Sequence, residues 1–135
     1  MSKESFPIYV VDDNESIRKA LQRLLRSAGY HTVAFASAEA FMDYTPESGE
    51  GCLVLDILLP GMTGLELQES LASSGATYPV IFMTAHDNLQ WQARAKKEGA
   101  VAYLQKPFSE QALLDAVGRC RQPIRSNKTN DRQYR

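Results

Sequence analysis

Gly51-Cys52-Leu53-Val54-Leu55-Asp56 is the stretch of sequence that decides the fold. Its apolar residues form a run as long as one β-strand, and that run stops at a single carboxylate. A short apolar run bounded by turn residues is typical of a strand buried on both faces of a parallel sheet. Ligands of open α/β sheets bind beyond the carboxyl ends of such strands, so Asp56 lies where a functional crevice is expected. The alternative is that Asp56 only caps the next turn, as aspartate often does.

Four further apolar runs alternate with segments of helical periodicity. The runs are Ile8–Val11, His31–Phe35, Pro79–Thr84 and Val101–Leu104. Five strands alternating with five helices predict an α/β fold in which one parallel sheet is doubly wound, with helices on both faces. The first helix is predicted by an apolar stripe of Ile17, Ala20, Leu21, Leu24, Leu25 and Ala28. The second and third are predicted by a Ser37 cap and a Thr63–Glu66 capping box. The fourth is predicted over residues 88–98, and the fifth by a Ser109 cap before the apolar residues Ala112, Leu113, Ala116 and Val117.

Composition and charge indicate one ordinary globular domain. The chain has 135 residues, of which 44% are hydrophobic and 23% are charged. The net charge is −1, but the residues from Arg119 onward carry +5, so the remainder carries −6. An acidic body argues against general nucleic-acid binding and suits a site that gathers carboxylates around a cation.

The cysteines and the hydropathy pattern bear on the compartment. Cys52 and Cys120 do not form a disulfide framework, and Cys52 is most simply a small core residue. A reducing, cytoplasmic location is therefore expected. Neither a signal peptide nor an apolar run long enough to span a membrane is found, so no membrane association is expected.

Polar side chains follow four of the predicted strands. If the strands are parallel, these side chains share one edge of the sheet; they are Asp12 and Asp13, Asp56, Thr84, and Lys106. Each has an ordinary explanation, such as a helix cap or a turn, but all four explanations holding together is improbable. Three carboxylates at one place repel one another, and a hard divalent cation such as Mg²⁺ relieves that repulsion with oxygen ligands.

This set of groups suits phosphoryl transfer. With its charge partly neutralised by Mg²⁺, the Asp56 carboxylate can attack phosphorus and form an acyl phosphate. Mg²⁺ and Lys106 would stabilise charge on the transferring group, and Thr84 could donate its hydroxyl to the phosphoryl group afterwards.

The motifs at these strand ends resemble the receiver domain of two-component response regulators, especially the FixJ/NarL type. The resemblance runs from about Ile8 to about Cys120 and implies a flavodoxin-like (CheY-like) fold. The motifs are Val11-Asp12-Asp13, Leu55-Asp56, Leu59-Pro60-Gly61-Met62-Thr63-Gly64, Met83-Thr84-Ala85 and Lys106-Pro107-Phe108, with His31–Glu39 and Gly99-Ala100-Val101 pointing to the FixJ/NarL type.

The resemblance implies a role for each site residue. Asp56 would accept the phosphoryl group from a sensor histidine kinase, and the domain would catalyse only its own phosphorylation and dephosphorylation, without being an enzyme for an external metabolite. The other implied roles are Asp13 as a direct Mg²⁺ ligand, Asp12 as a ligand mostly through water, the backbone carbonyl of Leu58 as a further ligand, Lys106 as a phosphoryl contact, Pro107 as a cis-proline, and Thr84 with Tyr103 as the switch pair.

The resemblance also sets expectations for domain boundaries and output. Residues 5–122 are expected to form the receiver domain, and 123–135 a polar basic tail or the start of a linker to an absent output domain. Phosphorylation would shift the face of the fourth helix, fifth strand and fifth helix, controlling homodimerisation or an output domain that regulates transcription. DNA would be reached only through that C-terminal domain. The alternative is a single-domain receiver acting on a protein partner. The Asn88–Arg94 segment departs from FixJ-like receivers, which usually begin this helix with proline.

Two other classes of function each lack a residue that they need. A phosphatase of the haloacid-dehalogenase type, which also uses an aspartyl phosphate, wants a second acid two residues after the nucleophile, and that position is Leu58. A flavodoxin-like binder of a nucleotide or flavin wants a glycine-rich loop after the first strand, where acids stand instead.

Overall fold

A computed structural model describes residues 6–44, 50–75, 78–86 and 88–121. Within these ranges five strands alternate with five helices, as predicted, and the ends of the elements fall within one or two residues of the expected positions. The elements are β1 (Ile8–Val11), α1 (Glu15–Ser27), β2 (Thr32–Phe35), α2 (Ala38–Asp43), β3 (Cys52–Asp56), α3 (Gly64–Ser73), β4 (Val80–Thr84), α4 (Leu89–Lys97), β5 (Ala102–Gln105) and α5 (Glu110–Arg121). The predicted tail, 123–135, lies outside the described residues.

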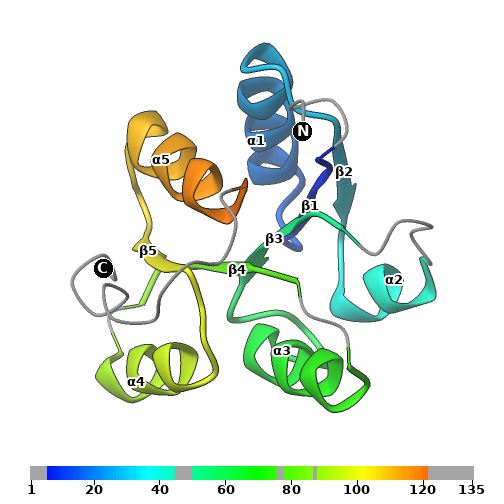
Figure 1. The fold of residues 1–135 in the computed structure, drawn as a ribbon, viewed down its shortest axis with the longest axis vertical. Coiled ribbons are helices and arrows are strands. Elements are labelled where there is room, and N and C mark those ends of the chain that lie inside the picture. The colour runs from blue at the N-terminus through cyan, green and yellow to red at the C-terminus, as the bar shows by residue number, and fades with distance from the viewer. Residues whose placement is uncertain (1–5, 45–49, 76–77, 87, 122–135) are drawn as a thin grey trace.

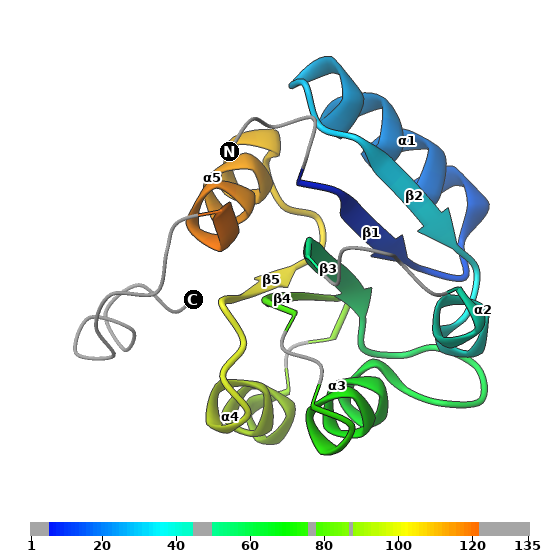
Figure 2. The ribbon, with the colours of Figure 1, turned by 45° about the vertical axis from the view of Figure 1, so that its right-hand side comes forward.

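The five strands form one parallel sheet in the order β2-β1-β3-β4-β5 (Figures 1 and 2). β3 therefore lies in the centre, with β1 on one side and β4 on the other, and Val11 pairs with Leu55. The chain winds outward from β1 to one edge and from β3 to the other. The predicted doubly wound, flavodoxin-like (CheY-like) fold is confirmed, and the reversal of winding occurs between the two strands that carry the acids.

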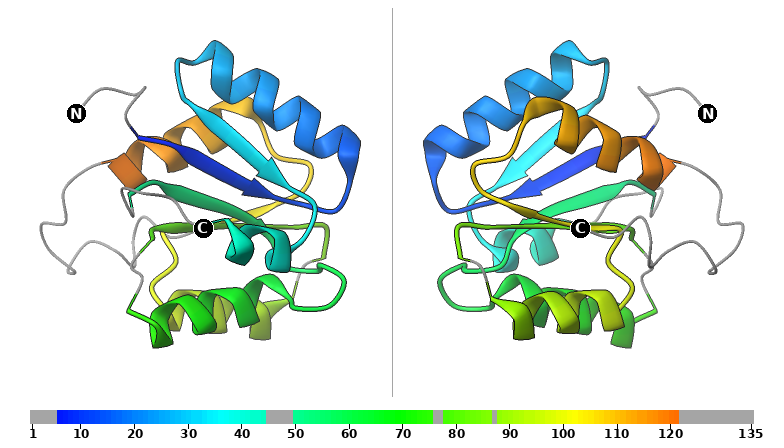
Figure 3. Two further views of the ribbon diagram at one scale, coloured as in Figure 1. Left: turned by 90° about the vertical axis from the view of Figure 1, so that its right-hand side faces the viewer. Right: turned by 90° about the vertical axis from the view of Figure 1, so that its left-hand side faces the viewer.

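Two hydrophobic cores lie on opposite faces of the sheet. Figure 3 shows α1 and α5 on one face and α2, α3 and α4 on the other. The central strand serves both cores by alternation: Cys52 and Val54 pack beneath α1 and α5, whereas Leu53 and Leu55 pack on the other side. Because both faces are covered, all five residues of β3 are buried, which explains its unbroken apolar sequence.

Side-chain caps fix where the helices begin. The Asn14 side chain accepts a hydrogen bond from the Ile17 N–H, and so caps α1. The predicted capping box of α3 is present: Thr63 Oγ1 accepts from the Glu66 N–H at 3.1 Å, and Glu66 Oε1 accepts from the Thr63 N–H at 2.9 Å. The predicted Ser109 cap of α5 is also found.

The predicted buried stripe of α1 is wrong at one position. Leu21 and Leu25 are buried and pack on the sheet, but Ala20 is exposed. The two leucines are four residues apart and occupy the centre of the buried face, whereas Ala20 lies at its margin.

Gly64 brings the start of α3 very close to the end of β3. A Cβ atom at position 64 would lie 2.6 Å from the backbone oxygen of Asp56 and 3.1 Å from the Cα of Ile57. Both atoms belong to the backbone and cannot turn aside as a side chain could. Gly64 therefore permits the approach that holds the loop after Asp56 against its strand.

Candidate functional site

Three acids from two neighbouring strands meet at the carboxyl edge of the sheet. Asp12 and Asp13 follow β1, and Asp56 is the last residue of β3. Each residue offers a carboxylate oxygen, and the three oxygens all lie within 4.8 Å of one another. Asp12 and Asp56 are buried, whereas Asp13 is exposed. A compact set of hard oxygen donors, open on one side to water, fits an ion such as Mg²⁺.

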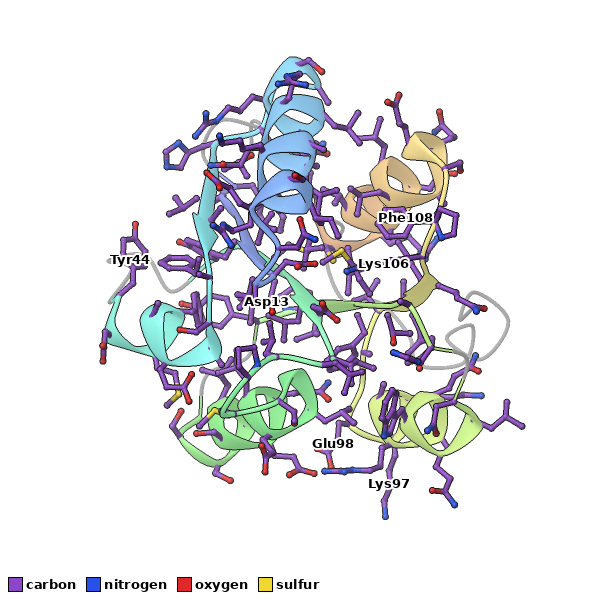
Figure 4. All side chains as sticks on the ribbon, turned by 180° about the vertical axis from the view of Figure 1, so that it is seen from behind. Asp13, Tyr44, Lys97, Glu98, Lys106 and Phe108 are labelled. Atoms are coloured by element: carbon purple, nitrogen blue, oxygen red, sulfur yellow. The ribbon has the colours of Figure 1, made fainter. Side chains whose placement is uncertain are left out.

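Lys106 joins the two buried acids. Its Nζ donates to Asp12 Oδ2 at 2.8 Å and to Asp56 Oδ2 at 3.3 Å. Figure 4 shows that Asp13 and Lys106 come from different elements, the turn after β1 and the end of β5. The peptide bond between Lys106 and Pro107 is cis.

Burial and charge act against each other in this cluster. Burial raises the pKa of Asp56; Lys106 acts to lower that pKa, Asp12 acts to raise it, and the balance lies above the ordinary value. Burial acts to lower the pKa of Lys106, but its hydrogen bond to Asp12 and the charges of both acids outweigh burial and raise it. The lysine is therefore held charged, and one ammonium does not fully compensate the two buried carboxylates beside it.

The second oxygen of Asp56 organises the loop that follows. Asp56 Oδ1 accepts a hydrogen bond from the Leu58 N–H at 3.1 Å, while Oδ2 faces Lys106. Asp56 therefore caps the turn with one oxygen, while its other oxygen contacts Lys106; its role as phospho-acceptor stays a prediction. The Leu58 N–H is thus found beside Asp56; its carbonyl as a metal ligand stays a prediction.

Thr84 and Tyr103 are both buried, on the adjacent strands β4 and β5. The Thr84 hydroxyl accepts a hydrogen bond from the His86 N–H at 3.1 Å and does not cap α4, whose cap is Asn88. Tyr103 lies in the core beneath α2, α3 and α4, and the half-buried Trp91 packs against the same core. The role of Thr84 and Tyr103 as a switch pair remains a prediction.

Sequence reasoning missed two residues that support the site. Arg18 donates to the backbone oxygen of Asp12 at 2.9 Å, so α1 holds the end of β1. The Glu39 carboxylate accepts from the Met62 N–H at 3.1 Å, so α2 holds the loop after Asp56. Arg18 lies one turn beyond the helix cap, which was a weak signal. Glu39 and Met62 lie 23 residues apart and leave no local signal.

Comparison with known families is consistent with this geometry. A family model of the response regulator receiver domain matches residues 8–118. The chain belongs to this family, whose members act in two-component signalling.

Several relatives carry the same segment. Nodulation protein W of Bradyrhizobium diazoefficiens is 46% identical over 110 residues, covering 82% of this chain and 48% of that protein. The transcriptional regulatory protein FixJ of Azorhizobium caulinodans is 40% identical over 114 residues, covering 84% of this chain and 54% of that protein. The chain thus spans about half the length of the curated relatives it matches. The resemblance to FixJ-type receivers is confirmed.

Solved structures show the same fold. The response regulator StyR matches with a TM-score of 0.80 and 46% identity, covering 84% of this chain and 58% of that chain. The crystal structure of FixJ-N matches with a TM-score of 0.81 and 32% identity, covering 90% of this chain and 97% of that chain. In the part of the chain that the structure describes, no helix is long and apolar enough to cross a membrane.

Proposed function

We propose that this domain is a switch that is activated by phosphorylation of Asp56. The observation that carries the proposal is the position of the Asp56 carboxylate, at the end of the central strand, 3.3 Å from the Lys106 ammonium and within 4.8 Å of two further acids. A lone surface aspartate has none of these neighbours. The donor would be the phosphohistidine of a sensor histidine kinase.

The chain's own residues bring about the transfer. An Asp56 oxygen attacks phosphorus, the bond from phosphorus to the histidine nitrogen breaks, and the histidine takes up a proton. Lys106 already contacts Asp56 Oδ2 and would donate to the incoming phosphoryl oxygens. Asp13, Asp12, Asp56 and the Leu58 carbonyl would hold Mg²⁺, which when bound supplies positive charge against the phosphoryl oxygens. The acyl phosphate at Asp56 is hydrolysed slowly, so the protein is a switch without being an enzyme for an external substrate.

The response would begin at Thr84. To donate its hydroxyl to a phosphoryl oxygen on Asp56, the Thr84 side chain would turn away from the His86 N–H, from which it now accepts a hydrogen bond. The space that it vacates would accept Tyr103, and the face formed by α4, β5 and α5 would shift between two existing conformations. Leu89, the first residue of α4, is 76% exposed.

The wider role follows from the relatives. Because FixJ is named a transcriptional regulatory protein, we propose that the parent protein regulates transcription, in the cytoplasm and through a C-terminal DNA-binding domain. Phosphorylation would promote a homodimer or release the output domain. A receiver acting alone on a protein partner remains the alternative; the phosphatase is not favoured, because the position of its second acid is the exposed Leu58.

Mass spectrometry tests the proposal directly. With Mg²⁺ and acetyl phosphate, the intact mass should rise by about 80 Da, one phosphoryl group. Asp56→Asn should abolish the gain, and the exposed Asp43→Asn should retain it. Chelation of Mg²⁺ should also prevent the gain, because the carboxylates then repel the donor. An unmodified wild-type chain under these conditions would falsify the proposal.

A further inference from the structure

Two buried thiols lie in close contact at the edge of the sheet opposite the acids. The Sγ atoms of Cys52 and Cys120 are 2.9 Å apart, although the residues are separated by 68 positions. Neither is in a disulfide, and their exposed fractions are 0% and 7%. The two sulfur atoms would have to approach by about 0.9 Å to reach the bond length of about 2.05 Å.

The structure around the two thiols would let Cys120 move toward Cys52. Cys52 begins β3, the central strand, which pairs with β1 on one side and with β4 on the other. Cys120 is in the last turn of α5. A helix end moves more easily than a central strand, since its last carbonyls have no partner within the helix. The last turn of α5 can therefore carry Cys120 toward Cys52.

We propose that Cys52 and Cys120 are an oxidisable pair that closes into an intramolecular disulfide between β3 and α5. Nothing in the phosphorylation mechanism uses either thiol. The oxidant is a small disulfide, such as oxidised glutathione, which gains two electrons and leaves as two thiols.

The reaction proceeds by two thiol–disulfide exchanges. The Cys120 thiolate attacks one glutathione sulfur, forms a mixed disulfide and releases the first glutathione thiolate. The Cys52 thiolate then attacks Cys120 Sγ and releases the second. The two protein thiol protons end on the two glutathione molecules. Because burial raises the pKa of the Cys52 thiol, its attack should quicken with rising pH.

The bond would fasten the end of α5 to the middle of the sheet. Cys52 and Asp56 stand at opposite ends of the same strand, so the cross-link leaves the acids, Lys106 and the loop after Asp56 in place. Phosphorylation of Asp56 should therefore proceed at a similar rate in both redox forms. The last turn of α5, in contrast, would lose its freedom to shift.

Counting the free thiols of the full chain after oxidation tests this inference. After incubation with oxidised glutathione and capture of remaining thiols by a maleimide in denaturant, the monomer should carry no maleimide and have lost two hydrogen atoms. A non-reduced peptide map should join Cys52 to Cys120. The midpoint of thermal unfolding should rise by about 5–15 °C and return on reduction. Cys52→Ala and Cys120→Ala should each abolish the bond and the shift.

Three results would overturn the inference. They are two maleimide adducts after oxidation, a glutathione adduct as the final product, and a bond between two chains in place of one within a chain. If Cys52→Ala fails to fold because of its central position, Cys120→Ala, at the end of α5, gives the same comparison. None of these readouts depends on phosphorylation, so the inference and the proposed function can fail separately.

Discussion

At the residue scale, Lys106 balances two buried carboxylates that would otherwise repel each other. It contacts Asp12 at 2.8 Å and Asp56 at 3.3 Å, and it is itself mostly shielded from water. Such a cluster depends strongly on each member, since removing one charge leaves the others buried and uncompensated. The most informative substitution is therefore at Lys106, whose ammonium contacts both buried acids.

Lys106→Met should raise the pKa of Asp56 further and slow its phosphorylation. The pKa rises because the attraction of Lys106, which acts to lower it, is lost while burial and the charge of Asp12 remain. The rate should fall by about 10²-fold, the usual effect of removing one charge-stabilising donor. Carboxyl NMR titration and the rate of acetyl phosphate labelling measure the two effects. Lys19→Met, which removes an exposed pair with Glu15, should change neither.

Tyr9 makes the fold sensitive to alkali. Its ring is 2% exposed and lies among Phe35, Phe41, Tyr44 and Tyr78. Burial, with smaller contributions from Tyr44 and Tyr78, raises its pKa from 10.0 to about 12. The folded protein therefore holds this proton more tightly than the unfolded chain does.

The stability that Tyr9 contributes should be lost between pH 10 and about 12. Below that window both states are protonated, and within it the unfolded chain ionises first, which favours unfolding. Urea unfolding across the window should show a steeper loss for the wild type than for Tyr9→Phe. Parallel curves for the two proteins would contradict the assignment.

At the scale of single elements, the strands and caps were predictable because their signals are local. The apolar runs, the Thr63–Glu66 box and the Ser109 cap each lie within a few residues. The bond from Glu39 to the Met62 N–H was not predictable, because α2 and the loop meet only after folding. The meeting of the three acids was partly predictable. The parallel direction of the strands implied that the acids share one edge of the sheet, but the distances between them and the hydrogen bonds of Lys106 could not be known without the register of the strands.

The junction of β3 and α3 depends on the absence of a side chain at position 64. Gly64→Ala should destabilise the protein by about 2 kcal/mol, because its methyl group would meet backbone atoms that must shift. Gly118→Ala is the matched control within α5, where a Cβ meets nothing within 4 Å. That change should be neutral or stabilise by up to about 1 kcal/mol. Denaturant unfolding compares the two, and equal effects would show that the close approach is unimportant.

At the scale of the whole molecule, a chain of contacts leads from the site to α4. The Thr84 hydroxyl accepts from the His86 N–H, and the His86 ring stands edge-on to Trp91 with centroids 6.3 Å apart. Trp91 is the only tryptophan of the chain. Its fluorescence therefore reports on any rearrangement that begins when Thr84 leaves His86.

Adding Mg²⁺ with beryllofluoride, a phosphoryl mimic, should change the Trp91 emission spectrum. Asp56→Asn should show no change, because the mimic has no carboxylate to bind. Thr84→Ala should still bind the mimic but give a smaller change, since the link to His86 is missing. An unaltered wild-type spectrum, with the mimic shown to be bound, would mean that the switch does not reach α4.

The common direction of the five strands makes this domain a convenient scaffold for a sensor. The loops that follow the strands carry the reactive groups, whereas the loops that precede the strands lie at the opposite edge of the sheet. One of these is the turn at Gly99, where φ is +89° and a Cβ would meet nothing within 4 Å. A fluorescent peptide grafted there would stand clear of Asp56 while remaining attached to both α4 and β5.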